Sequence, residues 1–600
     1  MLNSYLTQIR MNLLLTLRNR MALFFSFIFP LIFFFAFSQG SGGGNGQQIV
    51  NLVLGLGVLG SGLFGVGMRA VQDREQNILR RFKVAPIGPG EILVSGLVTV
   101  MALQLPNMAF IVFLAHRMFG APWPPQPISL LIFVSLGLFA FASIGGIIAA
   151  LVNSMQEGVL ITQLFYFPML FLSGVTIPIA IMPAWLQTVA QFIPMTYFTT
   201  GLQPILRGTE SLLDNATAAS ALALTAVLGT FLAAKLFRWE KEEKLRPAAK
   251  FWLLAVLGPF FVLGSWQMHA KTNIAKAKVL GREAQRSRTA LIRDARLFLG
   301  DGTVIDQGSV LIKDGKIAEI YTGPAPDAKS LRADAIEAAG KTLLPGLIDV
   351  RVHLSLPGFP INDPQFYQNP DQSFDRELAA YLFSGVTAVK SAGDQPDMVG
   401  RHQAAIASGE RLGSELFPDV KATDEAYQPA LAALEARRAF QAGRTDLLER
   451  SLVQQVIPRQ WFAQLKDAMK ESARPEIIMN PLAPDLARKN LAEAYAAGRL
   501  LVVGTESGYP MVVHGPSAHR ELQLWAEAGI PPAVALQAAT YNAAKLLRAD
   551  QRIGLIRKGY DASLLLVDGN PLQDISATER ISTVFFKGER VDRSGLFEQK

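Results

Sequence analysis

The chain has 600 residues, more than the roughly 50–250 that one domain usually contains, so we expect at least two domains. Hydrophobic residues make up 50% of it and gather as long uncharged runs in the first half, which excludes a wholly soluble protein. The absence of cysteine excludes disulfides and thiolate metal sites, and the net charge of +8 is more typical of basic inner loops of a membrane protein than of nucleic-acid binding.

Apolar runs in the first half predict membrane-spanning helices, because a helix needs about 20 such residues to cross about 30 Å of hydrocarbon. A buried core helix is the alternative for any one run, but a series of runs favours a polytopic membrane domain. The runs lie near residues 21–38, 50–68, 92–115, 128–151, 158–181, 217–234 and 251–268.

Basic residues predict how these spans are oriented. In residues 1–20, leucine and isoleucine recur at helical spacing with Arg10 and Arg18 between them, which predicts an amphipathic helix on the inner membrane face. Loops after the second and sixth runs are rich in lysine and arginine, and the loops after the first, third and fifth are poor in them. We therefore expect a cytoplasmic N-terminus in the inner membrane and an extracytoplasmic C-terminal domain.

Two stretches of the first half resemble a transporter family. They are DREQNILRRFKVAPIGPGEIL (73–93) and FYFPMLFLSGVTIPIAIMPAWLQTVAQFIPMTYFTTGLQPILRG (165–208). With the amphipathic start and six spans, residues 1–240 resemble the permease of ABC-2-type exporters. Proline and glycine interrupt 173–200, which favours a re-entrant hairpin over one straight helix. The glycine-rich second span predicts close helix packing, either within the bundle or at a dimer seam.

The resemblance implies that residues 73–93 dock on a separate ATP-binding subunit, and that the permease acts as a homo- or heterodimer. Glu75, Arg80, Arg81 and Lys83 are the candidate coupling residues, and ordinary inner-face charges are the alternative. No nucleotide site is expected in this chain, because AGKTLLPG (339–346) lacks the first glycine of a phosphate-binding loop and has Ala335 there.

The second half shows a different, soluble pattern. Short alternating strands with Asp-Gly turns open it, strands return at residues 562–569 and 581–591, and helical segments lie between. Strands at both ends around an α-rich middle predict a small β-sandwich, formed by the two ends, that flanks an α/β body.

Several stretches of this half resemble metal-dependent amidohydrolases. TLLPGLIDVRVHL (342–354) resembles their first barrel strand, which ends in His-x-His. LFSGVTAVKSAG (382–393) resembles the next helix and strand, 500–547 the last strand and its helices, and 554–575 the closing sandwich. The resemblance covers residues 290–590 and implies a (β/α)₈ barrel with its site at the C-terminal mouth.

The resemblance implies a divalent metal such as zinc that activates water, held by histidines and often a carboxylated lysine, with a last-strand aspartate as the base. Here His353 keeps the second strand-one position, but Arg351 occupies the first, and a cation cannot ligate a cation. Glu506 replaces the aspartate, so it is the candidate catalytic residue and, with His353, a candidate metal ligand. His514 follows the last strand and is a candidate for substrate binding.

Other expected ligands are missing. His402 falls in a helical segment, His116 and His269 lie in the membrane half, and Lys421 is either the carboxylated lysine or a solvated one. Two ligands are too few for tight zinc binding, so the pair is either a hydrogen-bonded remnant or a weak, altered site.

The distance along the chain indicates that the barrel is incomplete. About 155 residues separate its first and last strands, whereas a complete barrel takes about 250 residues. Residues 422–499 are mostly helical in pattern, with PEIIMN (475–480) as the clear strand candidate, so middle strands are expected to be lost near 415–422.

The predicted fold is an all-α polytopic membrane domain plus an α/β domain, an incomplete (β/α)₈ amidohydrolase barrel with a flanking β-sandwich. The leading functional hypothesis is an exporter permease carrying a catalytically impaired domain. A membrane-tethered hydrolase of amide, cyclic amide or dipeptide C–N bonds is the alternative, with His514, His519 or a partner chain completing its metal site. The expected domains are 1–240 (permease), 241–289 (seventh span and linker), 290–345 (first sandwich strands), 346–550 (truncated barrel) and 551–600 (last sandwich strands).

Overall fold

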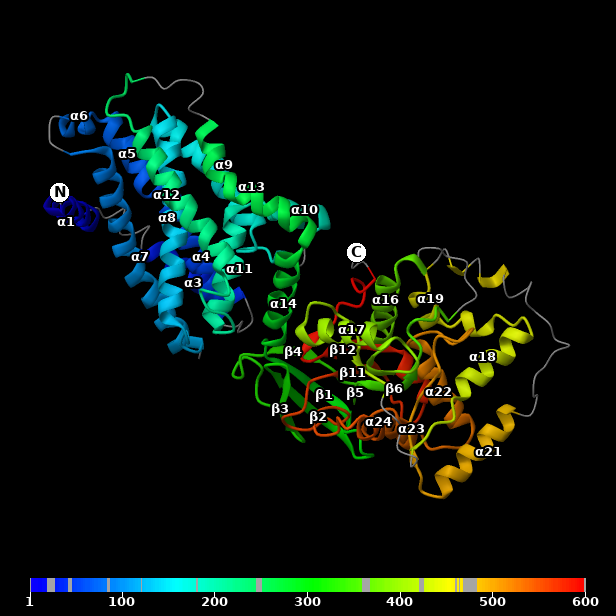
Figure 1. Cartoon of the computed structure of the whole chain (residues 1–600). Coiled ribbons are helices and arrows are strands. Elements are labelled where there is room, and N and C mark those ends of the chain that lie inside the picture. Colours follow the sequence, from blue (N-terminus) through cyan, green and yellow to red (C-terminus); the bar gives the residue numbers. More distant parts are fainter. Residues whose placement is uncertain are drawn as a thin grey trace. The chain divides into compact units, whose positions relative to one another are not determined.

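A computed structural model divides the chain into two compact units, Met1–Ala284 and Gln285–Lys600, each of which is described by itself (Figure 1). The structure describes residues 2–18, 27–40, 46–83, 87–119, 121–179, 182–243, 251–358, 367–419, 426–458, 461–462, 465–467 and 483–597.

The first unit is helical, because its apolar runs satisfy their backbone hydrogen bonds within each segment. Its core is a single cluster of buried apolar side chains from most of these helices. The helices are α1 (Leu2–Arg18), α3 (Phe29–Gly40), α4 (Gly46–Phe64), α5 (Val66–Glu75), α6 (Ile78–Phe82), α7 (Pro89–Phe119), α8 (Pro127–Leu151), α9 (Met155–Leu172), α10 (Ala184–Ala190), α11 (Pro194–Arg207), α12 (Ala216–Lys235), α13 (Trp252–Ala270) and α14 (Thr272–Arg286), the last crossing into the second unit.

Five stretches of the described residues are long and apolar enough to cross a membrane, and they match five of the predicted spans. The predicted span near 21–38 lies partly outside the described residues. The one near 251–268 forms α13, and its crossing stays a prediction. The five stretches are Ile49–Glu75, Pro89–Phe119, Pro127–Leu151, Met155–Leu172 and Ala216–Lys235.

The segment predicted to be broken by proline and glycine is broken. Helix α9 ends at Leu172, Gly174 takes a left-handed φ of 89°, and the short α10 precedes α11, which begins at Pro194. The interruption is confirmed, and re-entry into the membrane stays a prediction.

Several glycines of the second span pack within the bundle, whereas a Cβ on Gly60 would meet nothing within 4 Å. A Cβ on Gly62 would lie 2.6 Å from the Cβ of Phe141, and one on Gly67 would lie 2.3 Å from the carbonyl oxygen of Gly145. Backbones of α4, α5 and α8 therefore touch directly, as small residues allow in lipid.

Strands from both ends of the second unit form one hydrogen-bonded sheet. Its order is β13-β12-β11-β5-β1-β2-β3, with β4 beside β1, and β11 joins the C-terminal strands to β5 through antiparallel pairing of Leu565 with Leu344. The predicted Asp-Gly turn is present between β2 and β3, where Asp314 and Gly315 have φ of 50° and 78°. The strands are β1 (Ala290–Phe298), β2 (Val304–Lys313), β3 (Lys316–Tyr321), β4 (Asp334–Glu337), β5 (Lys341–Pro345), β11 (Leu564–Asp568), β12 (Ile581–Phe586) and β13 (Glu589–Arg590).

The body of the second unit is a partial barrel of short parallel strands. β7 pairs with β6 and β8, the chain after β10 runs beside β6 through a hydrogen bond from Val350 N to Val503 O (3.0 Å), and β10 pairs with β9. The segment after β10 thus lies beside β6, although β10 and β6 belong to separate sheets. In sequence, β9 begins soon after β8. The strands are β6 (Leu347–Val352), β7 (Val386–Ser391), β8 (Glu415–Phe417), β9 (Ala426–Tyr427) and β10 (Leu500–Leu501).

The strand candidate PEIIMN (475–480) and the lysine candidate Lys421 lie outside the described residues.

Helices cover this partial barrel. The helices are α16 (Pro370–Phe383), α17 (Pro396–Ser408), α18 (Leu431–Gln441), the 3₁₀ helix η4 (Asp446–Leu448), α19 (Ser451–Val456), α21 (Ala483–Ala496), α22 (Pro516–Glu527), α23 (Pro532–Ala538), α24 (Tyr541–Leu546) and the 3₁₀ helix η5 (Ile575–Glu579).

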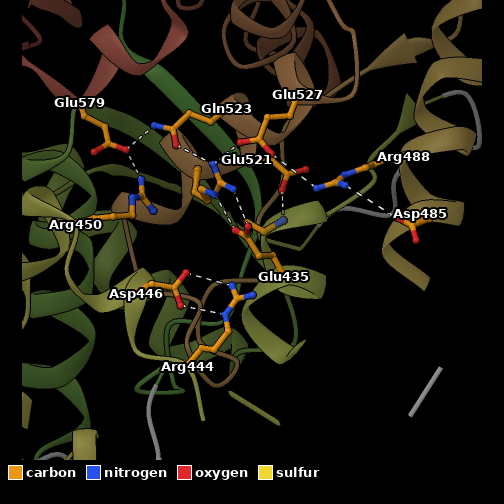
Figure 2. A network of polar contacts seen from close by, with 12 residues as sticks. Glu435, Arg444, Asp446, Arg450, Asp485, Arg488, Glu521, Gln523, Glu527 and Glu579 are labelled. Atoms are coloured by element: carbon orange, nitrogen blue, oxygen red, sulfur yellow. Dashed lines mark hydrogen bonds and ion pairs between the residues drawn. The ribbon is translucent and has the colours of Figure 1, made fainter. Parts of the chain in front are cut away.

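Charged side chains tie α22 to its neighbours, as Figure 2 shows. Arg520 donates two hydrogen bonds of 2.7 Å to the carboxylate of Glu435 on α18, and Gln523 donates to Glu579 of η5 at 2.8 Å. These contacts hold α22, which begins just after His514, against the rest of the unit.

Candidate functional site

The candidate metal ligands meet where β6 ends, beside the segment that follows β10. Side chains alternate along β6, so residues 349, 351 and 353 share a face. Glu506 N donates to Arg351 O (2.9 Å) and His353 N donates to Ser507 O (2.8 Å), which brings Glu506 opposite that face. Glu506 takes a left-handed φ of 58°, a strained conformation of the kind that gathers at functional sites.

Both oxygens of Glu506 are occupied by side chains of β6 and the residue after it. His353 Nε2 lies 2.8 Å from Oε2, and Arg351 Nε lies 2.7 Å from Oε1. The structure therefore brings the two predicted ligands together, but as hydrogen-bonding partners. Arg351 neutralises the carboxylate that a divalent ion needs, and its own charge repels such an ion.

Electrostatics favour the charged forms of this pair. The Glu506 carboxylate raises the pKa of His353 above its usual value of 6.5, against the opposing effect of burial. Burial raises the pKa of Glu506, but the hydrogen bond from His353 and the charges of Arg351 and His353 outweigh it, so that pKa is lowered from 4.5. The pair's stabilisation is full between about pH 4.5 and 6.5. It is lost as pH rises through the folded pKa of His353, and it is lost as pH falls through the folded pKa of Glu506.

Replacing Glu506 with glutamine is expected to lower the pKa of His353, because the strongest of the contacts that raise it is removed while the opposing effect of burial stays. With six histidines in the chain, selective labelling allows an NMR titration of the ring protons. Glu527→Gln, at an exposed position of α22, is the matched control and should leave the titration unchanged. An unchanged His353 titration in Glu506→Gln would contradict the ion pair.

Two carboxylates that sequence reasoning missed shape the surroundings. Asp394, after β7, accepts hydrogen bonds from Leu354 N (3.0 Å) and Ser391 Oγ (2.7 Å), and so holds the loop that follows His353. Asp349 is fully buried and accepts a 2.6 Å hydrogen bond from Thr505 Oγ1. Burial raises the pKa of Asp349 to about 7, although hydrogen bonds from Thr505 and Arg351 N act against this. The sequence did contain one signal for Asp349. It lies two residues before Arg351 and four before His353, which places it on the same face of a strand.

The remaining histidines lie elsewhere. His514 is buried, with Nδ1 3.8 Å from Oε2 of the buried Glu377, and burial lowers the pKa of its imidazole. His519 Nε2 donates to Ser384 O at 2.7 Å. His402 lies on α17, as expected, 2.7 Å from a carboxylate oxygen of Asp375. Over the part of the chain that the structure describes, no group of three or more His, Asp or Glu side chains is placed to hold a metal ion.

Among the residues that the structure describes, this site does not supply the ligand set of a hydrolytic metal. A catalytic zinc takes three protein ligands and keeps a fourth position for water. The described site offers one imidazole and one carboxylate, and an arginine occupies the carboxylate.

The coupling candidates gather at one end of α5. Helix α5 ends at Glu75, the chain turns at Asn77 (φ 58°), and α6 follows with Arg80 and Arg81 exposed. Glu75 Oε2 accepts from Met155 N at 3.2 Å, which is the start of α9. Lys83 reaches Glu240 at 3.0 Å and Glu243 at 3.4 Å.

The stretch AGKTLLPG (339–346) forms a turn that leads into a strand. Gly340 makes a turn (φ 76°) and Lys341 begins strand β5. A phosphate-binding loop instead leads into a helix N-terminus, where backbone N–H groups point at the phosphates.

Comparisons with known proteins match the two halves separately. A model of the ABC-2 type transporter family matches residues 4–206, and one of the amidohydrolase family matches residues 468–591. Linearmycin resistance permease protein LnrN of Bacillus subtilis is 25% identical over 144 residues, 24% of this chain and 37% of that protein. Inner membrane transport permease YhhJ of Escherichia coli is 29% identical over 145 residues, 23% of this chain and 38% of that protein.

The C-terminal half has relatives among hydrolases. Dihydroorotase of Syntrophotalea carbinolica is 29% identical over 131 residues, 20% of this chain and 28% of that protein. A solved Xaa-Pro dipeptidase aligns with 51% of this chain and all of its own at 20% identity, with a TM-score of 0.38. The chain spans 28–38% of the length of these curated relatives. Its N-terminal part is an ABC-2-type membrane domain, and its C-terminal part, joined to it in one polypeptide, is an amidohydrolase-family domain.

Proposed function

We propose that the chain is the permease subunit of an ABC-type exporter, driven by a separate ATP-binding subunit, and that its C-terminal domain has lost metal-dependent hydrolysis. The observation that carries the first part is α6, a short helix set off from the membrane helices by a turn, with adjacent exposed arginines. A protruding charged helix of this kind suits docking on a partner protein.

One side of helix α6 is held by contacts within the protein, and the other side is exposed. Leu79 is buried, while Lys83 is tied to Glu240 and Glu243. Arg80 and Arg81 remain exposed beside Phe82, whose side chain is 39% exposed. Arginine and an aromatic residue are the types enriched at energetically dominant positions of protein interfaces.

The second part of the proposal rests on the closed arrangement of Arg351, His353 and Glu506. The guanidinium of Arg351 offsets the negative charge of this carboxylate, and one imidazole with one carboxylate falls short of the three protein ligands of a catalytic zinc site. His514, next to Glu377, belongs to the same domain, and a contact of His514 with a bound molecule stays a prediction.

Assembly and orientation complete the proposal. We place the N-terminus and α6 in the cytoplasm, because basic residues concentrate in the loops on that side, and the C-terminal domain outside. Two permease subunits, identical or different, would form the membrane part. Protease digestion of intact cells tests the orientation, and cleavage only after lysis would contradict it.

Reversing the charge of both exposed arginines tests the coupling. Arg80→Glu with Arg81→Glu is expected to weaken binding of the ATP-binding subunit by about 30-fold or more, because two central contacts become repulsive. The measurement is affinity for the co-expressed ATP-binding subunit in detergent, with ATP hydrolysis by the complex as a second readout.

Arg117→Glu is the matched control, since Arg117 is exposed near the opposite end of α7 from α6. It should leave both readouts unchanged. Equal affinity of the Arg80→Glu, Arg81→Glu protein and the unmodified chain would contradict the assignment of α6.

A further inference from the structure

Two buried arginines meet at the C-terminal end of helix α8. Arg74 donates from Nη1 to Ala149 O (3.0 Å) and from Nη2 to Val152 O (2.6 Å). Arg238 donates from Nη2 to the same Val152 O and from Nη1 to Asn153 Oδ1 (3.0 Å). Each arginine is only 4% exposed. One arginine comes from α5 and the other from the segment after α12, so three separate parts of the chain converge on one carbonyl.

The last carbonyls of a helix have no partner within it, and the helix dipole makes that end favourable to cations. A single lysine or glycine cap would satisfy this need. Burying two like charges side by side is costly, so an arrangement with two guanidinium groups calls for a role beyond capping. The planar guanidinium supplies such a role, because its fixed fork of donors holds two acceptors at once.

Arg74 and Arg238 are also linked to the candidate coupling residues Glu75 and Lys83. Arg238 Nη1 also donates to Glu243 O at 3.1 Å, and the Glu243 carboxylate pairs with Lys83 at the end of α6 (3.4 Å). Arg74 precedes Glu75, which accepts from Met155 N at the start of α9. Polar contacts, joined by covalent links within Glu243 and between Arg74 and Glu75, therefore connect the end of α6 to the end of α8 and to the start of α9.

Helix α8 is well placed to carry a displacement into the membrane. It packs against α4, α5 and α12, and most of its side chains are buried. Gly67 of α5 lies so close to the carbonyl of Gly145 that no side chain separates α5 from α8 at this point. Packed helices in such direct contact move as rigid bodies rather than deform.

We propose that Arg74 and Arg238 form a clamp that transmits displacement of α6 to helix α8. The proposal rests on the proposed function, because an ATP-binding subunit must displace α6. In this proposal the two arginines affect transport by positioning helix α8. They contact neither the solute nor ATP.

The first experiment tests the clamp in the chain alone. Since the chain has no cysteine, Phe82→Cys on α6 and Ile128→Cys at the far end of α8 accept spin labels selectively. The 25 residues of α8 span about 37 Å, a separation that pulsed electron paramagnetic resonance measures. With both Arg74→Gln and Arg238→Gln, we expect the distance distribution to broaden about twofold.

Arg117→Gln is the control, and its distribution should match that of the labelled chain with both clamp arginines. If the double variant does not fold, Arg238→Lys carries the test, because lysine keeps the charge but lacks the fork. We expect a distribution broader than that of the unmodified clamp. An unchanged distribution in the folded double variant, or in Arg238→Lys, overturns the clamp.

The second experiment adds the co-expressed ATP-binding subunit and compares distances with and without ATP. An ATP-dependent shift with both arginines present, reduced about 5-fold in the double variant, supports the clamp. An equal shift in both proteins overturns the clamp and leaves the proposed function standing. No shift in either protein overturns the proposed function, while the clamp is still decided by the first experiment.

Discussion

Replacing Arg351 with histidine is expected to create a zinc site from the His353–Glu506 pair. The side chains of residues 351 and 353 both reach the Glu506 carboxylate, at 2.7 and 2.8 Å, so a histidine at 351 adds a third ligand on the same face. Three protein ligands are the minimum of catalytic zinc sites. The substitution also removes the cation. Repulsion of a divalent ion by a unit charge 4 Å away is about 8 kcal/mol at an effective dielectric of 20 and about 2 kcal/mol in bulk water. The half-exposed Arg351 lies between these limits.

The expected result is a zinc affinity at least about 100-fold above that of the unmodified chain. Metal analysis after dialysis, followed by competition with a zinc-binding dye, measures it. Arg437→His makes the same change on the exposed face of α18 and should bind no more zinc than the unmodified chain.

Adding Glu506→Ala to Arg351→His should abolish the gain, because only two ligands remain. Equal zinc in Arg351→His and the unmodified chain would contradict the geometry described here. About one tightly held zinc per unmodified chain would overturn the loss of metal and favour the membrane-tethered hydrolase.

Truncating Glu521 to alanine is expected to destabilise the C-terminal unit more than any surface change. Glu521, which Figure 2 labels, is fully buried on α22. It accepts hydrogen bonds from Leu431 N (3.0 Å), Ala432 N (2.6 Å) and Trp525 Nε1 (2.8 Å). The first two donors are the otherwise unpaired N–H groups that begin α18. Removing the carboxylate leaves three buried N–H donors without a hydrogen-bond partner. The expected loss in the free energy of unfolding is about 4 kcal/mol.

A loss of this size is a large fraction of the stability of a whole domain, about 5–15 kcal/mol. Protease resistance of the whole chain in detergent, measured against urea concentration, reports it through cleavage within residues 285–600. Glu527→Ala is the matched control on the same helix. It removes an exposed ion pair with Arg520 and should cost about 0.5 kcal/mol. Equal urea midpoints for the two variants would show that Glu521 does not hold α18 and α22 together.

The sequence by itself determined the division of the chain and the type of each half. Long uncharged runs cross a bilayer whatever their neighbours are, because the requirement is local, and five of them form the expected long helices. The Asp314-Gly315 turn is local in the same way. Alternation along β6 placed Arg351 and His353 on one face, since the side-chain period of a strand is two.

Tertiary structure alone decided what those side chains do. Both oxygens of Glu506 bind Arg351 and His353 because the segment after β10 lies beside β6, about 150 residues away in the chain. The meeting of Arg74 and Arg238 at Val152 O likewise joins positions that no sequence spacing connects. Charge and polarity can be read locally, whereas the partner that satisfies a buried charge is chosen by packing, because desolvation makes only a paired arrangement stable.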